Sequence, residues 1–416
     1  MRFSPPASAA NAVACLLAAI AGEGFAQADA RLEPSDSSAR GRLSSFLEAR
    51  ALAERRRAAI EAEISANGPY SPALVDKLNA LAFLYREIGE EELAVQSLRQ
   101  ALQIVRANAG LFSLDQVPLM LQLIDGERTL GNAAAVAELE SQLLGLAYRH
   151  PNDLRSADIL RRAGDRQVEL FQLYVDRALP PQITIEVGPE MAGRRPLPPA
   201  RSAAIGAEKL YLDAIAVLHR TGAFDHEALP ELERKLVSTY YTERTQTGPD
   251  RGRIEAIERL GRQAYERLIA YAAAGSGTLE ERARALVELG DWELVFTKNA
   301  TALDRYREAY AMLADAGGHD ALLAELFTPD TPIALPTFVP NRFVPPSTSD
   351  ARYVELEFDI SKYGKTRAIH VTDLNGDEAE QAAQAMIRTI ARRRFRPMLV
   401  DGEPMRASSV VVRYGF

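Results

Sequence analysis

The sequence predicts a mainly α-helical protein that ends in a small α+β domain. From Leu43 to about Asn108, and in further segments up to residue 327, apolar residues recur at the three- and four-residue spacing of amphipathic helices. After residue 350 the apolar residues alternate instead, as they do in strands with one buried face. Two stretches with six prolines each, 179–201 and 328–350, separate these regions and oppose regular helix.

Composition places the chain among globular proteins. Its 416 residues are 47% hydrophobic and 25% charged, which argues against a wholly disordered, collagenous or multi-span membrane protein. The formal net charge is −8. Because phosphate binding relies on a concentrated basic face, an acidic body argues against nucleic acid as a partner.

The first 28 residues have the pattern of an export signal. Arg2 is followed by the apolar run 12–22 and by Ala26-Gln27-Ala28, the small-x-small motif that a signal peptidase cuts. The apolar run is shorter than the roughly twenty residues that a membrane span requires. Cleavage would start the mature chain at Asp29 and place it in the periplasm. The alternative is an uncleaved signal that anchors the protein in the inner membrane.

No motif in the chain carries recognisable catalytic or metal chemistry. Cys15, the one cysteine, lies in the export signal, so the mature chain has no thiol for disulfides, zinc or nucleophilic catalysis. The five histidines, His150, His219, His226, His319 and His370, form no helical i, i+4 pair. Asp373, Asn375 and Asp377 lack the further residues of a calcium loop and are interpreted as the turn before a helix. We therefore expect no enzyme, no metal and no cofactor.

The first helical region contains a hairpin with a characteristic pattern of small and large residues. Gly89 separates two helices whose shared faces are Leu78, Leu81, Ala82 and Tyr85 in the first, and Ala94, Leu98, Ala101 and Leu102 in the second. A second set with the same offsets comprises Leu286, Leu289, Gly290, Ala302, Tyr306 and Ala309. Both resemble the tetratricopeptide repeat, whose small residues allow close helix approach and whose hairpins stack into an α-solenoid.

These patterns divide the chain into successive parts. They are a signal at 1–28, a first helical half at 29–178, a proline-rich insertion at 179–201, a second helical half at 202–327, a proline-rich linker at 328–350 and a C-terminal domain at 351–416. Further helices are predicted at 128–148, 154–179, 203–221, 228–243 and 254–274. Tyr240, Tyr241 and Trp292 could line a groove of the solenoid or belong to its core.

The C-terminal domain is predicted to contain a hairpin, a helix and a final strand. Val354, Leu356, Phe358 and Ile360 share one strand face, and a turn at 363–365 leads to a returning strand at 367–373. A helix from about Asp377 packs on this sheet through Ala382, Ala383, Met386, Ile387 and Ile390. Extended chain follows at 395–397, a turn at 401–404 and a last strand at 406–416.

This order of elements, with Phe395-Arg396-Pro397, Asp401-Gly402-Glu403-Pro404 and a final strand that ends in an aromatic residue, resembles the TonB C-terminal domain. The resemblance implies a periplasmic α+β module whose edge strand can pair with a segment of an outer-membrane receptor. The candidate partner contacts are Arg393, Arg394, Phe395, Arg396, Val410, Val412 and Tyr414.

Together these features favour a non-catalytic periplasmic adaptor that binds protein partners in the periplasm or outer membrane. The repeat scaffold would bind one partner and the C-terminal domain would dock on another, with self-association through the last strand as a further possibility. The alternative is a divergent TonB-type energy transducer or a regulator of outer-membrane transport. An enzyme hidden in the helical body would require converging carboxylates or histidines in a deep pocket.

Overall fold

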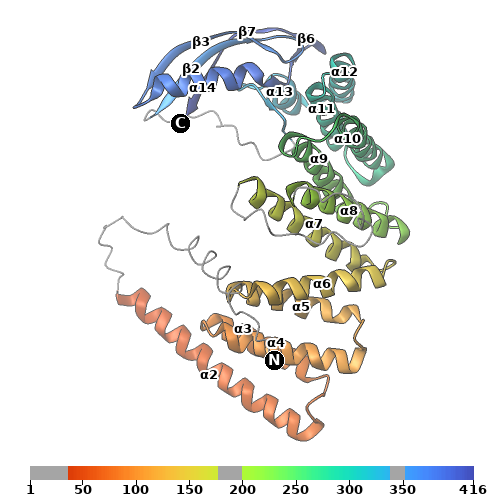
Figure 1. Ribbon diagram of the computed structural model, residues 1–416, viewed down its shortest axis with the longest axis vertical. Coiled ribbons are helices and arrows are strands. Elements are labelled where there is room, and N and C mark those ends of the chain that lie inside the picture. The colour runs from red at the N-terminus through yellow and green to blue at the C-terminus, as the bar shows by residue number, and fades with distance from the viewer. Residues whose placement is uncertain (1–35, 177–198, 338–351) are drawn as a thin grey trace, which may run out of the picture. The chain divides into compact units, whose positions relative to one another are not determined.

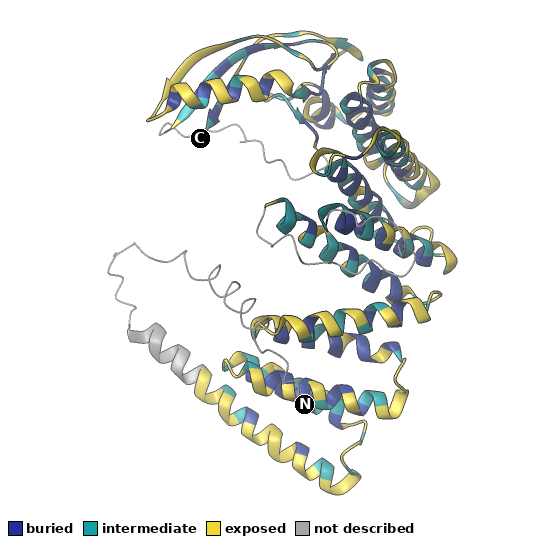
Figure 2. Ribbon diagram, in the orientation of Figure 1, coloured by how far each residue is buried: buried dark blue, intermediate teal, exposed yellow. Residues whose placement is uncertain are grey.

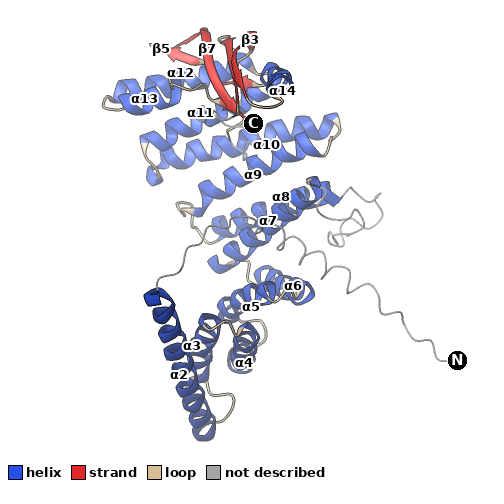
Figure 3. Ribbon diagram, turned by 90° about the vertical axis from the view of Figure 1, so that its left-hand side faces the viewer, coloured by secondary structure: helices blue, strands red, loops and turns tan. Residues whose placement is uncertain are grey.

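A computed structural model describes residues 36–176, 199–337 and 352–416. The predicted export signal, most of the stretch 179–201 and residues 338–350 of the predicted linker lie outside these ranges. The described chain is mainly helical, with its strands confined to the C-terminal region, as the sequence predicts (Figures 1 and 3). It divides into two compact units, Met1–Pro151 and Asn152–Phe416.

The first unit is a series of helices that each pack on the next. They are α2 (Asp36–Asn67), α3 (Leu74–Glu87), α4 (Glu91–Ala109), η1 (Leu114–Gln116), α5 (Val117–Thr129) and α6 (Ala133–Arg149). The predicted hairpin is α3 and α4, and all eight of its pattern residues are buried. Helix α5 was not predicted. Its Pro118 lies in the first turn, where proline is tolerated.

Helix α2 packs on α3 with few buried side chains. From residue 46 onwards, only Ala53 and Ile60 of α2 are fully buried (Figure 2). A polar contact supplements them: Glu63 accepts hydrogen bonds from Lys77 Nζ at 2.6 Å, from Asn67 Nδ2 at 2.7 Å and from Ser71 Oγ at 2.9 Å. The carboxylate of Glu63 therefore ties the end of α2 to the start of α3.

The second unit begins with seven helices. They are α7 (Leu154–Val175), α8 (Pro199–Arg220), α9 (Ala228–Gln246), α10 (Arg251–Tyr271), α11 (Leu279–Val295), α12 (Asn299–Ala316) and α13 (Asp320–Phe327), with the short η3 (Ala272–Ser276) after α10. The stretch 179–201 lies between α7 and α8, which pack closely together. The chain divides at Pro151, and not in this proline-rich stretch, because α7 and α8 form one antiparallel pair.

Helix contacts in the second unit depend on small residues that receive aromatic rings. A Cβ atom built on Gly261 of α10 would lie 2.1 Å from the Trp292 ring of α11. The indole Nε1 of Trp292 donates to the carbonyl of Glu258 at 3.0 Å. Trp292 and Tyr240 are fully buried and Tyr241 is half-buried, so the first two belong to the core and do not line a groove.

The C-terminal domain is a three-stranded antiparallel sheet covered on one face by a helix. Its elements are β2 (Tyr353–Ile360), β3 (Thr366–Asn375), α14 (Ala379–Arg392), β4 (Arg394–Phe395), β5 (Met398–Val400), β6 (Glu403–Met405) and β7 (Ala407–Gly415). The strand order is β3-β2-β7. The four predicted apolar residues of β2 are buried against Ala383, Met386 and Ile390 of α14, with Ala382 and Ile387 partly buried beside them.

Part of the predicted linker belongs to this domain. Strand β1 (Ala334–Leu335) pairs antiparallel with β4, so that Ala334 lies opposite Phe395. The backbone N–H of Arg396 also donates to the carbonyl of Ile333 at 2.9 Å. Across the described ranges, every helix is either too short or too polar to cross a bilayer.

Acid should loosen the contact between α2 and α3. The three hydrogen bonds lower the pKa of Glu63 from 4.5 to about 2. The stabilisation is therefore complete above pH 4.5 and is lost as the pH falls towards 2. Protection factors of the α2 amides, which are exchange rates corrected for the intrinsic rate at each pH, should fall over this interval in the wild type, and Glu63→Gln should remove this fall. An identical pH profile in the variant would contradict the assignment.

Substitution of Gly261 by alanine should destabilise the second unit. The added methyl group would overlap the Trp292 ring, and overpacking of this kind costs about 1–3 kcal/mol. Gly252→Ala in the same helix is the matched control, because a Cβ there would lie 3.4 Å from Asp250 Oδ1, an ordinary contact. Urea unfolding of both variants measures the difference, and equal midpoints would contradict the packing argument.

Candidate functional site

The two edges of the C-terminal sheet differ in how well they could accept a further strand. Edge strand β3 has two register shifts against β2, at Glu355/Leu356 and at Glu357/Asp359, and a left-handed residue at Ala368. Such irregularities protect an edge from pairing. Edge strand β7 has one shift, between Phe358 and Ile360, and a left-handed residue at Ser409, and it then pairs regularly with β2 from Val410 as far as Gly415. Each edge strand has one left-handed residue, and β7 has the fewer register shifts, so the outer edge of β7 from Val410 onwards is the more regular template.

A hollow of about 350 Å³, here called the β7 groove, runs beside the first half of β7. Its lining comes from the end of α13 and the chain after it (Leu326, Phe327, Pro329, Asp330, Pro332 and Ile333), from Ile360, from residues 396–398 and from residues 407–411. The volume lies within the range of sites that hold ligands or side chains of a partner. Asp330 is exposed, and most of the other lining side chains are apolar.

Arg396 lines the groove and is anchored beneath it. Its side chain is 8% exposed, and its guanidinium binds the carboxylate of Asp291 in α11 with both donors of one fork, Nε to Oδ1 at 3.0 Å and Nη2 to Oδ2 at 2.6 Å. Its Nη1 donates to the carbonyl of Leu326 at 3.3 Å. The arginine therefore joins the C-terminal domain to α11 and to the end of α13.

Asp291 is a fully buried carboxylate with four hydrogen bonds. Besides the two from Arg396, it accepts one from the Tyr306 hydroxyl at 2.8 Å and one from Thr337 Oγ1 at 3.1 Å. Burial, and then the neighbouring Asp291 carboxylate, raise the pKa of Tyr306 well above its ordinary value, so the phenol remains a donor. Every lone-pair direction of the buried acid is thus used, as burial of a charge requires.

The residues predicted as partner contacts lie in three places. Val410 and Arg396 line the β7 groove. Phe395, Val412 and Tyr414 are buried in the core between the sheet and α14. Arg393 and Arg394 are half-buried and donate to backbone carbonyls, Arg393 Nη1 to Leu335 at 3.3 Å and Arg394 Nη1 to Tyr363 at 2.7 Å. The groove brings together two of the seven predicted residues.

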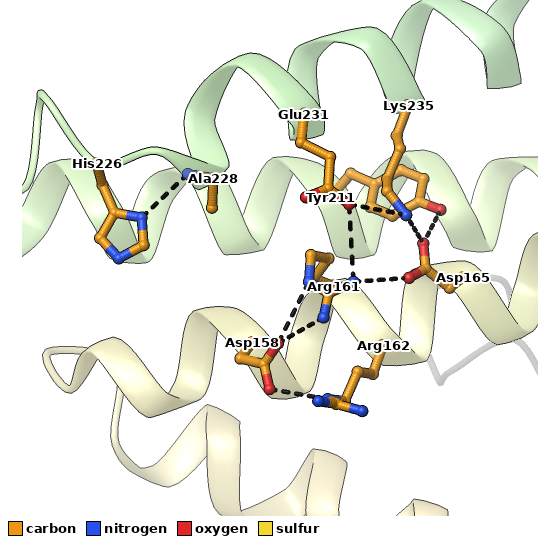
Figure 4. A network of polar contacts seen from close by, with 9 residues as sticks. All are labelled: Asp158, Arg161, Arg162, Asp165, Tyr211, His226, Ala228, Glu231 and Lys235. Carbon is orange, nitrogen blue, oxygen red and sulfur yellow. Dashed lines mark hydrogen bonds and ion pairs between the residues drawn. The ribbon is translucent and has the colours of Figure 1, made fainter. Parts of the chain in front are cut away.

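A second hollow, of about 460 Å³, lies among α7, α8 and the start of α9. Asp158, Arg161, His226 and Glu231 line it above the buried Leu232. His226 Nδ1 accepts the Ala228 N–H at 3.1 Å, and this bond caps the start of α9 (Figure 4). No cluster of metal-ligating side chains occurs in the parts of the chain that the structure describes.

The charges around this second hollow largely satisfy one another. Arg161 binds Asp158 at 2.7 Å and Asp165 at 3.0 Å, and Lys235 binds Asp165 at 2.6 Å and Glu231 at 3.2 Å. Arg162 completes the set by binding Asp158 at 2.8 Å (Figure 4). Three carboxylates thus face three cations, and the cluster joins α7 to α9. We assign it a structural role.

Sequence reasoning missed Asp291 although it identified both Gly290 and Tyr306. A Cβ on Gly290 would lie 2.6 Å from the Tyr306 ring, so the glycine admits the ring that places its hydroxyl on Asp291. The available signal was the dipeptide Gly290-Asp291, which also occurs as Gly164-Asp165 in α7. A buried acid cannot be distinguished from a surface acid until its partners are known.

Comparison with known proteins leaves the chain without an assigned family. No protein-family model matches it, and no curated protein matches it. A crystal structure described as BtubC (BKLC) from P. vanneervenii is 14% identical and superposes with a TM-score of 0.37, covering 66% of this chain and 92% of that chain. Similarity at this level carries no argument about fold or function.

Removal of the Tyr306 hydroxyl should weaken the Asp291 cluster. Tyr306→Phe leaves the ring in place but removes one of four hydrogen bonds to a buried carboxylate, which costs about 1–3 kcal/mol. Tyr310→Phe in the same helix is the control, because the Tyr310 ring packs on Phe327 and its hydroxyl is not among the donors to Asp291. Denaturant unfolding compares the two, and equal losses of stability would contradict the role of the hydroxyl.

Proposed function

We propose that this protein is a non-catalytic adaptor of the bacterial envelope that binds an extended segment of a partner protein along the outer edge of β7. The proposal rests on one observation: the sheet edge with the fewer register shifts, that of β7, borders a hollow of about 350 Å³. An added strand would gain backbone hydrogen bonds from β7, while its side chains would enter the groove.

The groove lining indicates which segment would fit. The apolar side chains of Ile333, Met398 and Val410 favour apolar residues at alternate positions of the added strand. Asp330 at the rim favours a basic residue near one end. The guanidinium of Arg396 is already bound to Asp291 and adds no free charge. The preferred partner is therefore an extended, mainly apolar segment with a lysine or arginine.

The resemblance to the TonB C-terminal domain supports this mode of binding, because strand addition at a sheet edge is the interaction that the resemblance implies. In this proposal the partner is an outer-membrane receptor or another envelope protein, and the adaptor is periplasmic after cleavage at Ala28. The helical part would be a tetratricopeptide-like solenoid. Its hairpins, with Ala82 buried in α3, Leu98 buried in α4 and Gly290 against Tyr306, support that interpretation.

The contacts that attach the C-terminal domain to the helices favour an adaptor over an energy transducer. A transducer needs a domain that can reach its receptor on a long spacer. Here the domain is tied to α11 through a buried ion pair, and β1 of the predicted linker pairs with β4. These contacts support a fixed docking module.

Closing the groove should abolish capture of the partner. Ser408 is exposed and lines the groove, so Ser408→Trp would fill the groove without replacing a core residue. His370→Trp on the opposite edge strand β3 is the matched control. With the full mature chain as bait for solubilised Gram-negative envelopes, Ser408→Trp should reduce recovery of outer-membrane barrels roughly tenfold or more, which corresponds to about 1.4 kcal/mol.

The control should capture as the wild type does. Equal recovery by both tryptophan variants would reject the β7 groove as the binding site. Loss of recovery with His370→Trp alone would transfer the site to the β3 edge.

A further inference from the structure

Two helix pairs of the second unit share one constellation of residues. In α8 the buried residues Ala207, Tyr211, Ala214 and Leu218 have the same spacing as Ala302, Tyr306, Ala309 and Leu313 in α12. In α7 the residues Ala157, Leu160, Gly164 and Asp165 have the same spacing as Ala283, Leu286, Gly290 and Asp291 in α11. The pair α7 and α8 is therefore a counterpart of α11 and α12.

The shared residues make the same contacts in both pairs. A Cβ on Gly164 would lie 2.5 Å from the Tyr211 ring, as one on Gly290 would lie 2.6 Å from Tyr306. The Tyr211 hydroxyl donates to Asp165 at 2.8 Å, the distance between Tyr306 and Asp291. Asp165 and Tyr211 are 46 residues apart in the sequence, whereas Asp291 and Tyr306 are 15 residues apart. The longer connection contains the stretch 179–201. That stretch is thus an insertion within one repeat.

Asp165 and Asp291 each also bind a cationic side chain, but the two cations come from different kinds of element. Asp165 binds Lys235 at 2.6 Å, and Lys235 is the eighth residue of the following helix α9 (Figure 4). The helix that follows α12 is α13, which is eight residues long and ends at Phe327. At that end Arg396 supplies the cation, since it binds Asp291 and donates to Leu326 in the last turn of α13.

We propose that the C-terminal domain is the terminal cap of the helical array, with Arg396 in the role that Lys235 has for the pair α7 and α8, and that the β7 groove is a composite site. One wall of the groove is the end of α13 and the chain after it, and the other is β7. Asp291 connects the two walls through Arg396 and Thr337. Residues 351–416 alone would contain the strands but not the groove.

The buried aspartate explains why a cap is needed. Without a following helix or a substitute, Asp291 would keep only Tyr306 as a partner on the helical side, and a buried, uncompensated charge is strongly destabilising. Asp165 is less dependent on one cation, because Arg161 also binds it, and its side chain is 29% exposed. Asp291, with no exposure, relies on Arg396.

Hydrogen exchange of the full chain tests the cap without any partner, so its outcome is independent of the proposed binding function. In the wild type, the backbone amide hydrogens of α11, α12, β2 and β7 should exchange with one common free energy, because these elements would unfold together. Arg396→Met should accelerate exchange roughly hundredfold in both groove walls, 326–335 and 398–411, as loss of one partner from a buried pair predicts. Lys235→Met is the matched control and should affect α7–α9 alone.

The proposal is overturned if the groove walls keep their wild-type exchange in Arg396→Met, or if the wild-type strands open independently of α11 and α12. If Arg396→Met does not fold, Arg396→Lys takes its place. The lysine keeps the positive charge but lacks the second of the two donors with which Arg396 binds Asp291. We therefore expect a smaller acceleration of amide exchange, confined to the same segments. Acceleration in α7–α9 would again count against the cap.

Discussion

The buried pair between Asp291 and Arg396 is the interaction on which the second unit depends. Four hydrogen bonds converge on one carboxylate from three segments: α12, the chain after β1, and the turn between β4 and β5. Transfer of both charges from water is costly, and the pair offsets that cost only because its donors are all in place.

Small residues make that arrangement possible. The helices of the second unit approach closely where glycine receives an aromatic ring, at Gly164 with Tyr211, at Gly261 with Trp292 and at Gly290 with Tyr306. In two of these contacts the phenol then reaches the aspartate that follows the glycine. Packing and electrostatics are therefore linked: the glycine is required for the ring, and the ring is required for the acid.

Much of the architecture was predictable from local patterns. The alternation in β2, the apolar face of α14 and the presence of α7, α8, α9 and α10 follow from side-chain periodicity, because one buried face per element is a local requirement. The exact limits of these helices differ from the predicted ones. Helix α5 was not predicted; a proline such as Pro118 is compatible with a helix only in its first turn, and the start of the helix is not evident from the sequence. Among the candidate contacts, Val410 lies at the groove, whereas Phe395, Val412 and Tyr414 lie in the core.

The sequence by itself determined the helical body, the change of period at the C-terminal domain and the absence of thiol chemistry in the chain after Cys15. Only the tertiary structure decided that Asp291 is buried, that Arg396 is its partner 105 residues away, and that α13 and β7 together enclose a groove. Periodicity records which face of an element is apolar. It does not record which distant charge an acid meets, and that pairing is fixed by the packing of the whole unit.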